Sequence, residues 1–196
     1  IPLAEDGGTI QRIGRWVLER ACAAAVLIES EGHPALSDDW AICVNVSARQ
    51  LQHESFSLDL RDVVAGSGWQ LDRLELEVTE SVFDHRHPAA LETLRALHAL
   101  GARVHVDDFG AGYSSLSRLH DFPIDAIKID RSFVDRLDDP HEAAVVRLIM
   151  RLAHELGLGV TAEGVSTDAQ ASALLGLGCD VAQGYRAAAR RHRRGS

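Results

Sequence analysis

The chain has 196 residues, of which 46% are hydrophobic and 25% are charged, and this composition supports one globular domain with a substantial core. Its formal net charge of -9 disfavours non-specific binding to a nucleic acid polymer or to an anionic membrane. The three cysteines, Cys22, Cys43 and Cys179, lie far apart in the sequence, so neither a structural zinc site nor a disulfide framework is expected.

The sequence shows no membrane or export signal. No apolar segment approaches the roughly 18 to 20 residues that a membrane-spanning helix needs, and there is no signal-peptide pattern. We therefore expect a cytoplasmic module. Because the chain begins with Ile1 rather than methionine, we expect it to be part of a longer protein, and the cytoplasmic part of a membrane-anchored protein stays open.

Helices and strands are expected to alternate along the chain. Apolar periodicity and breaker residues predict, in chain order, a helix over 10–28, a strand over 40–46, a helix over 56–65, a strand over 74–78, a helix over 88–100, a strand over 103–106, a short helix over 114–120, a strand over 126–129, a helix over 140–156, a strand over 159–162, a helix over 168–177 and a strand over 181–182. The first helix is expected to bury one apolar face, made of Ile10, Ile13, Val17, Ala24 and Ile28.

This alternation implies parallel strands joined by helical crossovers, in either an open doubly wound sheet or a closed eight-stranded barrel. Polar residues stand at or near the carboxyl end of each of the six strands: Asn45, Glu77, Asp107 with Asp108, Lys128, Glu163 and Gln183. In a barrel such ends converge on one mouth, whereas in an open sheet they lie along an edge. We therefore favour an α/β fold of the (β/α) barrel type, with about six of its eight strands in this chain.

The adjacent carboxylates Asp107 and Asp108 follow an apolar strand and precede a glycine-containing turn. Hard cations such as Mg2+ or Mn2+ take oxygen ligands, so Asn45, Glu77 and Asp107 could hold one ion, and Asp107 with Asp108 could bridge to a second. Such a pair of ions assists phosphoryl displacement.

Lys128 would add a fixed positive charge, and Glu163 a further ligand or a general base. Each residue also has an ordinary structural role open to it, such as a salt bridge between Lys128 and Asp107. The residues alone do not separate metal-assisted phosphodiester hydrolysis from metal-assisted proton abstraction, which also pairs lysine with Mg2+.

Six segments together resemble one family in order and spacing: VNVSARQL at 44–51, ELEVTES at 75–81, DDFGAGYSSLSRL at 107–119, IKIDRSFV at 127–134, AEGV at 162–165 and QGY at 183–185. They are similar to the motifs of the EAL-domain family of cyclic-di-GMP phosphodiesterases. The opening IPLAEDGGTI also resembles the segment that follows the signature strand of that family. The resemblance covers nearly the whole of residues 1–185.

The resemblance implies a modified TIM barrel that hydrolyses cyclic-di-GMP to linear pGpG with Mg2+ or Mn2+, two ions being expected. It implies that Asn45, Glu77 and Asp107 are metal ligands and that Asp108 is a ligand of the second metal. It implies that Lys128 orients the attacking water or the phosphate, and that Glu163 is the base or a ligand of the second metal. It also implies that Gln183 lies in the pocket near metal-bound water, and that Glu80 braces the loop after Asp108.

The chain departs from the family at both ends. The antiparallel first strand and the Glu-Ala-Leu strand would lie before Ile1, and residues 186–196 form a basic tail with five arginines, which we expect to be disordered. The domain is therefore expected over 1–185. A homodimer and an upstream sensor or diguanylate-cyclase domain are implied only by the resemblance. The alternative function is a catalytically silent module that binds cyclic-di-GMP or a protein partner.

Overall fold

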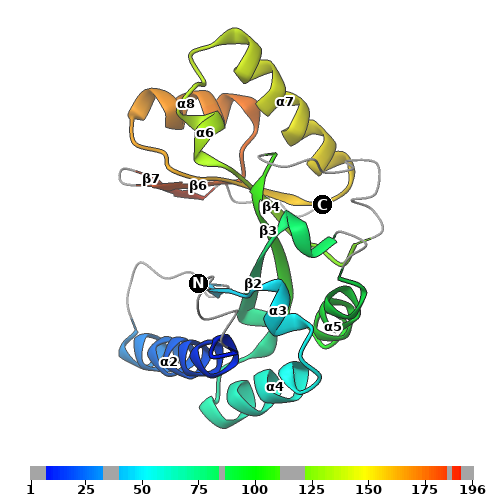
Figure 1. Cartoon of the computed structure of the whole chain (residues 1–196). Helices are drawn as coiled ribbons and strands as arrows, with labels where there is room; N and C mark the ends of the chain where they lie inside the picture. The colour runs from blue at the N-terminus through cyan, green and yellow to red at the C-terminus, as the bar shows by residue number, and fades with distance from the viewer. Residues whose placement is uncertain (1–7, 33–39, 84–86, 111–121, 185–186, 191–196) are drawn as a thin grey trace. The chain divides into compact units, whose positions relative to one another are not determined.

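The computed structural model describes residues 8–32, 40–83, 87–110, 122–184 and 187–190 (Figure 1). The chain separates into two compact units, residues 1–104 and residues 105–196. All six predicted strands are present. The short helix predicted over 114–120 lies outside the described residues. In the described ranges, no helix is both long and apolar enough to cross a membrane.

The first unit begins with helix α2 (Ile10–Glu31) and holds two parallel strands, β1 (Ile42–Asn45) and β2 (Leu74–Thr79). Helix α2 packs against β1 and against α4 (Phe56–Ser67). Helix α5 (Pro88–Ala99) packs against α4 and against the short helix α3 (Ala48–Leu51), and short 3-10 helices, η1 (Leu71–Arg73) and η2 (Glu80–Phe83), flank β2. Ser47 and Gln50 form a reciprocal capping box at the start of α3.

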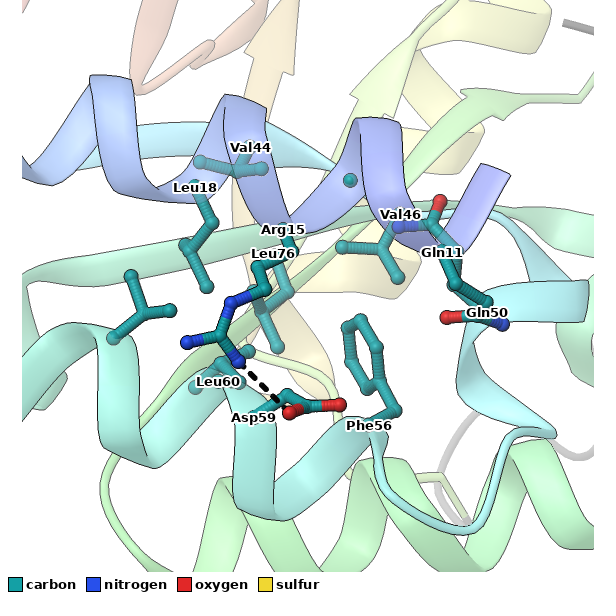
Figure 2. Close-up of a pocket in the computed structure, with 12 residues that line it drawn as sticks. Gln11, Arg15, Leu18, Val44, Val46, Gln50, Phe56, Asp59, Leu60 and Leu76 are labelled. Carbon is teal, nitrogen blue, oxygen red and sulfur yellow. Dashed lines mark hydrogen bonds and ion pairs between the residues drawn. The ribbon is translucent and has the colours of Figure 1, made fainter. Parts of the chain in front are cut away.

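A small pocket lies between α2, α4 and the two strands of this unit (Figure 2). Its walls are mainly apolar, with Leu18, Val44 and Phe56 among them, and the Arg15–Asp59 ion pair at 2.9 Å lies at its edge. Its volume of about 30 Å³ holds a few water molecules at most. We interpret it as a packing gap beneath α2.

The buried face of α2 differs from the predicted one. Ile10 is buried as expected, but Ile13, Val17 and Ile28 are 43%, 37% and 39% exposed. The other buried residues of the helix are Leu18, Cys22 and Ala25. The prediction was wrong because α2 carries two apolar stripes, and the stripe with Leu18, Cys22 and Ala25 is the one that is buried where α2 packs against β1 and α4.

The amino end of β2 is fixed by Arg73, whose guanidinium carbon lies 5.3 Å from the ring centroid of Trp40 and 4.4 Å from that of Trp69. Arg73 Nε donates a hydrogen bond to the Trp40 carbonyl at 2.9 Å, and the guanidinium also pairs with Glu29 near the end of α2. The two indole rings also contact each other, with centroids 4.9 Å apart, and a cation over an aromatic face is stabilised by the quadrupole of the ring. These contacts link the end of α2 to the start of β2.

The second unit takes strand β3 (Arg103–Phe109) from His105 onward and continues with β4 (Ala126–Ile129), β5 (Gly159–Ala162) and β6 (Val181–Gly184), all parallel. After β4 comes the short helix α6 (Arg131–Val134). Helix α7 (Pro140–Glu155) packs against β4, β5 and α8 (Asp168–Leu177). Strand β7 (Ala187–Arg190) pairs antiparallel with β6, so four residues of the basic tail have strand geometry.

The two buried cysteines give a simple test of the packing. Burial raises the pKa of the Cys179 thiol to about 11 and also raises the pKa of Cys22. Because the thiolate is the reactive form, Cys179 at pH 7 should be ionised roughly 300-fold less than an ordinary thiol. We expect iodoacetamide to label the exposed Cys43 first, as peptide mass spectrometry would show. Equal labelling rates at Cys43 and Cys179 in the native protein would contradict this packing.

Candidate active site

A bulge in β3 brings two carboxylates to the same place. Val106 pairs with Ile127 and Phe109 with Ile129, so β3 uses one residue more than β4 over this stretch. Asp108 has a φ of 53°, the one positive φ at a non-glycine residue among the described residues. In a regular strand, successive side chains point to opposite faces. The bulge and the left-handed backbone at Asp108 remove that alternation, so Asp107 and Asp108 can serve one site.

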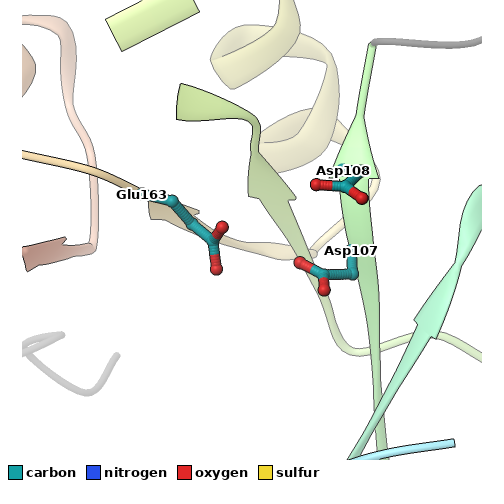
Figure 3. A group of neighbouring side chains, drawn as sticks. All are labelled: Asp107, Asp108 and Glu163. Carbon is teal, nitrogen blue, oxygen red and sulfur yellow. The ribbon is translucent and has the colours of Figure 1, made fainter. Parts of the chain in front are cut away.

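Glu163 completes an acidic cluster with these two residues (Figure 3). One ligand oxygen from each of Asp107, Asp108 and Glu163 lies within 4.8 Å of the other two. Glu163 follows β5 directly, and its backbone N–H donates to the Ile129 carbonyl of β4 at 3.1 Å. The structure therefore confirms that residues at the carboxyl ends of two different strands, β3 and β5, meet. This spacing of oxygens could hold a divalent cation.

Lys128 supplies the positive charge of this cluster. It stands in β4 between the two residues that pair across the bulge, Ile127 and Ile129. Its side chain is 5% exposed, with Nζ 3.0 Å from Asp107 Oδ1 and 2.5 Å from Glu163 Oε1. The structural salt bridge considered from the sequence is therefore present. One ammonium beside three carboxylates leaves a formal charge of -2, which a cation would neutralise.

The surroundings of the carboxylates also fit a cation. Burial raises the pKa of Asp108, and the charges of Asp107 and Asp130 raise it further, whereas Lys128 lowers it. Asp107 Oδ1 is a buried atom, and within the described ranges it accepts no hydrogen bond of good geometry, although Lys128 lies 3.0 Å away. A buried acceptor without a hydrogen bond is costly unless a cation or water satisfies it. The donor set therefore suits a hard divalent metal.

Asn45 and Glu77 form a pair of their own in the first unit. They are register partners at the carboxyl ends of β1 and β2. Glu77 is buried, while Asn45 is exposed. Two pairs earlier on the same strands, the Cys43 thiol donates to Glu75 Oε2 at 2.8 Å. The structure thus gathers the predicted residues in two groups, Asn45 with Glu77 in one unit and the acidic cluster with Lys128 in the other.

The remaining two predicted residues, Gln183 and Glu80, belong to different units. Gln183 stands in β6 with an exposed side chain, and its carbonyl accepts a hydrogen bond from Val165 N–H at 3.1 Å. Glu80 starts η2, and its Oε2 is a buried atom without a hydrogen-bond partner in the part of the chain that the structure describes. The loop that Glu80 is expected to brace, 111–121, lies outside the described residues. Both roles stay predictions.

Asp130 is a neighbour of the site that the sequence analysis missed. It follows Lys128 by two residues, and its Oδ1 accepts a hydrogen bond from Ser132 N–H at 3.0 Å, which caps α6. A hydrogen bond from the Ser132 side chain is the main cause that lowers the pKa of Asp130, and the backbone N–H of Ser132 lowers it further. The charge of Asp130 in turn raises the pKa of Asp108. Its position at the end of β4, in the segment IKID, was a signal that could have placed it at the site.

Known proteins share this arrangement of motifs. The sequence profile of the EAL domain matches residues 1–189 of the chain. The chain belongs to the EAL domain family. This is the family of cyclic-di-GMP phosphodiesterases, as the resemblance in the sequence indicated.

Individual relatives extend over almost the same residues. An uncharacterised signalling protein of Caulobacter vibrioides is 43% identical over 94% of this chain and 22% of its own length. The bifunctional diguanylate cyclase/cyclic di-GMP phosphodiesterase MucR of Pseudomonas aeruginosa is 41% identical over 94% of this chain and 27% of its own. This EAL domain chain thus spans about a quarter of the length of the curated relatives it matches.

Solved structures support the fold of this EAL domain. The PaMucR phosphodiesterase in complex with c-di-GMP has a TM-score of 0.85 and 42% identity, over 93% of this chain and 73% of the other. The fold is therefore that of the EAL domain, a modified TIM barrel of which the described residues hold six parallel strands, and the predicted fold class is confirmed.

Proposed function

We propose that this EAL domain hydrolyses cyclic-di-GMP to linear pGpG with Mg2+ or Mn2+, in a bacterial second-messenger pathway. The observation that carries the proposal is the cluster of Asp107, Asp108 and Glu163 around Lys128, whose one positive charge leaves a formal charge of -2 on the three carboxylates. The bound c-di-GMP of the PaMucR phosphodiesterase supports the choice of substrate.

The residues divide into two ligand sets under this proposal. As the resemblance to the family implies, Asn45, Glu77 and Asp107 would hold one ion, and Asp107 with Asp108 would hold the second. Glu163, which lies in the cluster with these two aspartates, would be a further ligand of the second ion or the general base. Divalent ions, when bound, lower the pKa of water and neutralise phosphate charge. A domain with a net charge of -9 needs such charges to receive an anionic dinucleotide.

The side chains have separate tasks in the reaction. In its role as general base, Glu163 takes a proton from the attacking water, whose oxygen forms the new bond to phosphorus. The bond from phosphorus to the 3′ oxygen breaks, and that oxygen leaves as a hydroxyl after it gains a proton. Lys128, held between Asp107 and Glu163, orients the phosphate, and Gln183 lies in the pocket beside the water. One water is consumed and linear pGpG is formed.

The wider assembly is a separate part of the proposal. Because the MucR relative is named as a cyclase and a phosphodiesterase, we propose that a sensor or diguanylate-cyclase domain accompanies this domain in the full-length protein. We also propose a homodimer, and this part of the proposal rests only on the likeness to the family.

Product chromatography tests the activity directly. The full-length protein is incubated with cyclic-di-GMP and Mn2+, and the nucleotides are separated over time. We expect pGpG to form, and EDTA to stop its formation because the ligand oxygens then hold no ion. Binding of cyclic-di-GMP without any pGpG would favour the alternative, a silent EAL module in which Lys128 alone neutralises Asp107 and Glu163.

A further inference from the structure

The segment that carries Glu163 is held by backbone hydrogen bonds on both sides. Glu163 N–H donates to the Ile129 carbonyl of β4, and Val165 N–H donates to the Gln183 carbonyl of β6, each at 3.1 Å. Between them, Gly164 has a φ of 70°, which turns the chain sharply. Glu163 therefore lies in a turn whose position is fixed by hydrogen bonds to the two neighbouring strands, β4 and β6.

Gly184 allows the turn to lie this close to β6. A Cβ atom at Gly184 would stand 2.0 Å from the Val165 oxygen and 2.5 Å from its nitrogen, whereas real Cβ atoms essentially never come within 3.0 Å of such neighbours. Its φ is not in the left-handed region, so the absence of a side chain is what the position requires. Because both obstructing atoms belong to the backbone, no rotamer change relieves the clash.

The opposite side of the turn is bounded by a side chain. A Cβ atom at Gly164 would meet Cγ of Arg131 at 2.4 Å and Cδ at 2.7 Å, so the stem of Arg131 covers this residue. Arg131 in turn pairs with Asp135 at 2.9 Å and is exposed to solvent. The Arg131 side chain is flexible and can rotate away from the turn, whereas the backbone atoms of Val165 that face Gly184 cannot.

We infer that Gly184 is a positioning residue for Glu163. Its bare α-carbon lets the Val165 peptide dock on β6, and that docking sets where the Glu163 carboxylate stands relative to Lys128, Asp107 and Asp108. Gly184 itself touches neither metal nor substrate in this role. The expected effect of Gly184 on kcat rests on the proposed function. The expected effect of Gly184 on cation binding does not depend on that function.

The test compares Gly184→Ala with Gly176→Ala in the full-length protein. Gly176 lies in α8 with open space around its α-carbon and ordinary backbone angles, so its replacement adds the same methyl group without a clash. We expect Gly184→Ala to weaken Mn2+ binding, measured by calorimetry, by about 10-fold, and to lower kcat by about 10- to 100-fold at a nearly constant KM. Gly176→Ala should match the wild type in both.

A double-mutant cycle separates positioning from general damage. If Gly184 acts through Glu163, then adding Gly184→Ala to Glu163→Gln should lower kcat and Mn2+ affinity little further. Additive effects, or a Gly184→Ala protein with wild-type Mn2+ affinity, would overturn the inference. If wild-type protein forms no pGpG, the proposed function fails while the Mn2+ comparison still decides the role of Gly184.

A second variant covers the case in which Gly184→Ala does not fold. Arg131→Ala releases the same turn from its other side without creating a clash, at a residue whose side chain is 67% exposed. We expect Mn2+ affinity to fall by about 3-fold while the melting temperature stays close to that of the wild type. Unchanged Mn2+ affinity in Arg131→Ala, with Gly184→Ala unfolded, would contradict the positioning role.

Discussion

Replacement of Asp107 by asparagine is expected to lower kcat for cyclic-di-GMP hydrolysis by about 10³-fold, because it removes the one carboxylate that both ligand sets share. Asparagine keeps the shape of the side chain but loses its negative charge. In Asp107 that charge meets Lys128 at 3.0 Å and lies within 4.8 Å of ligand oxygens of Asp108 and Glu163. Steady-state kinetics of pGpG formation, with Mn2+ varied, give the measurement.

The matched control for this experiment is Asp138→Asn. Asp138 is an exposed aspartate of the same unit and stands outside the acidic cluster, so the same chemical change should leave kcat within about 2-fold of the wild type. Wild-type turnover in Asp107→Asn would remove Asp107 from the metal site. An equal loss in both variants would point to an effect of net charge instead.

Replacement of Lys128 by methionine should have two separable effects. Lys128 is the single lysine of the chain, and its buried ammonium neutralises Asp107 and Glu163. Without it, and without metal, the carboxylates repel one another, and we expect the free energy of unfolding to fall by about 2 kcal/mol. Mn2+ should recover part of this loss, because a bound cation replaces the missing positive charge.

Urea unfolding with EDTA and with Mn2+ measures the first effect, and kinetics measure the second. We expect kcat to fall by about 10²-fold even with Mn2+ saturating, because the phosphate loses a fixed cation. Lys128→Arg is the informative control, since it keeps the charge but places a larger planar group between Asp107 and Glu163. It should retain stability better than activity. Equal stability of wild type and Lys128→Met in EDTA would contradict the neutralising role.

Strand positions could be predicted well from the sequence because alternation and short apolar runs depend on local residues. The strands over 126–129 and 159–162 have the bounds that the sequence predicted. The buried face of α2 could not be predicted in the same way. That helix has two apolar stripes, and only the packing partners, β1 and α4, decide which of the two is buried.

The site shows a similar division. Parallel strands place their carboxyl ends at one edge, so the meeting of Asp107, Lys128 and Glu163 followed from strand order. The bulge at Asp108 did not follow, because nothing in DDFG states that a non-glycine residue adopts a φ of 53°. The charge of Asp130 was missed for a related reason: its effect on Asp108 depends on distance in space.

The cluster of Trp40, Arg73 and Trp69 has a consequence for spectroscopy. The three tryptophans of the chain, at positions 16, 40 and 69, all belong to residues 1–104, whereas the acidic cluster belongs to residues 105–196. Tryptophan fluorescence therefore reports the unfolding of residues 1–104 and does not report directly on residues 105–196. A melt followed by fluorescence and by circular dichroism would show from one sample whether the two halves unfold as a single cooperative step.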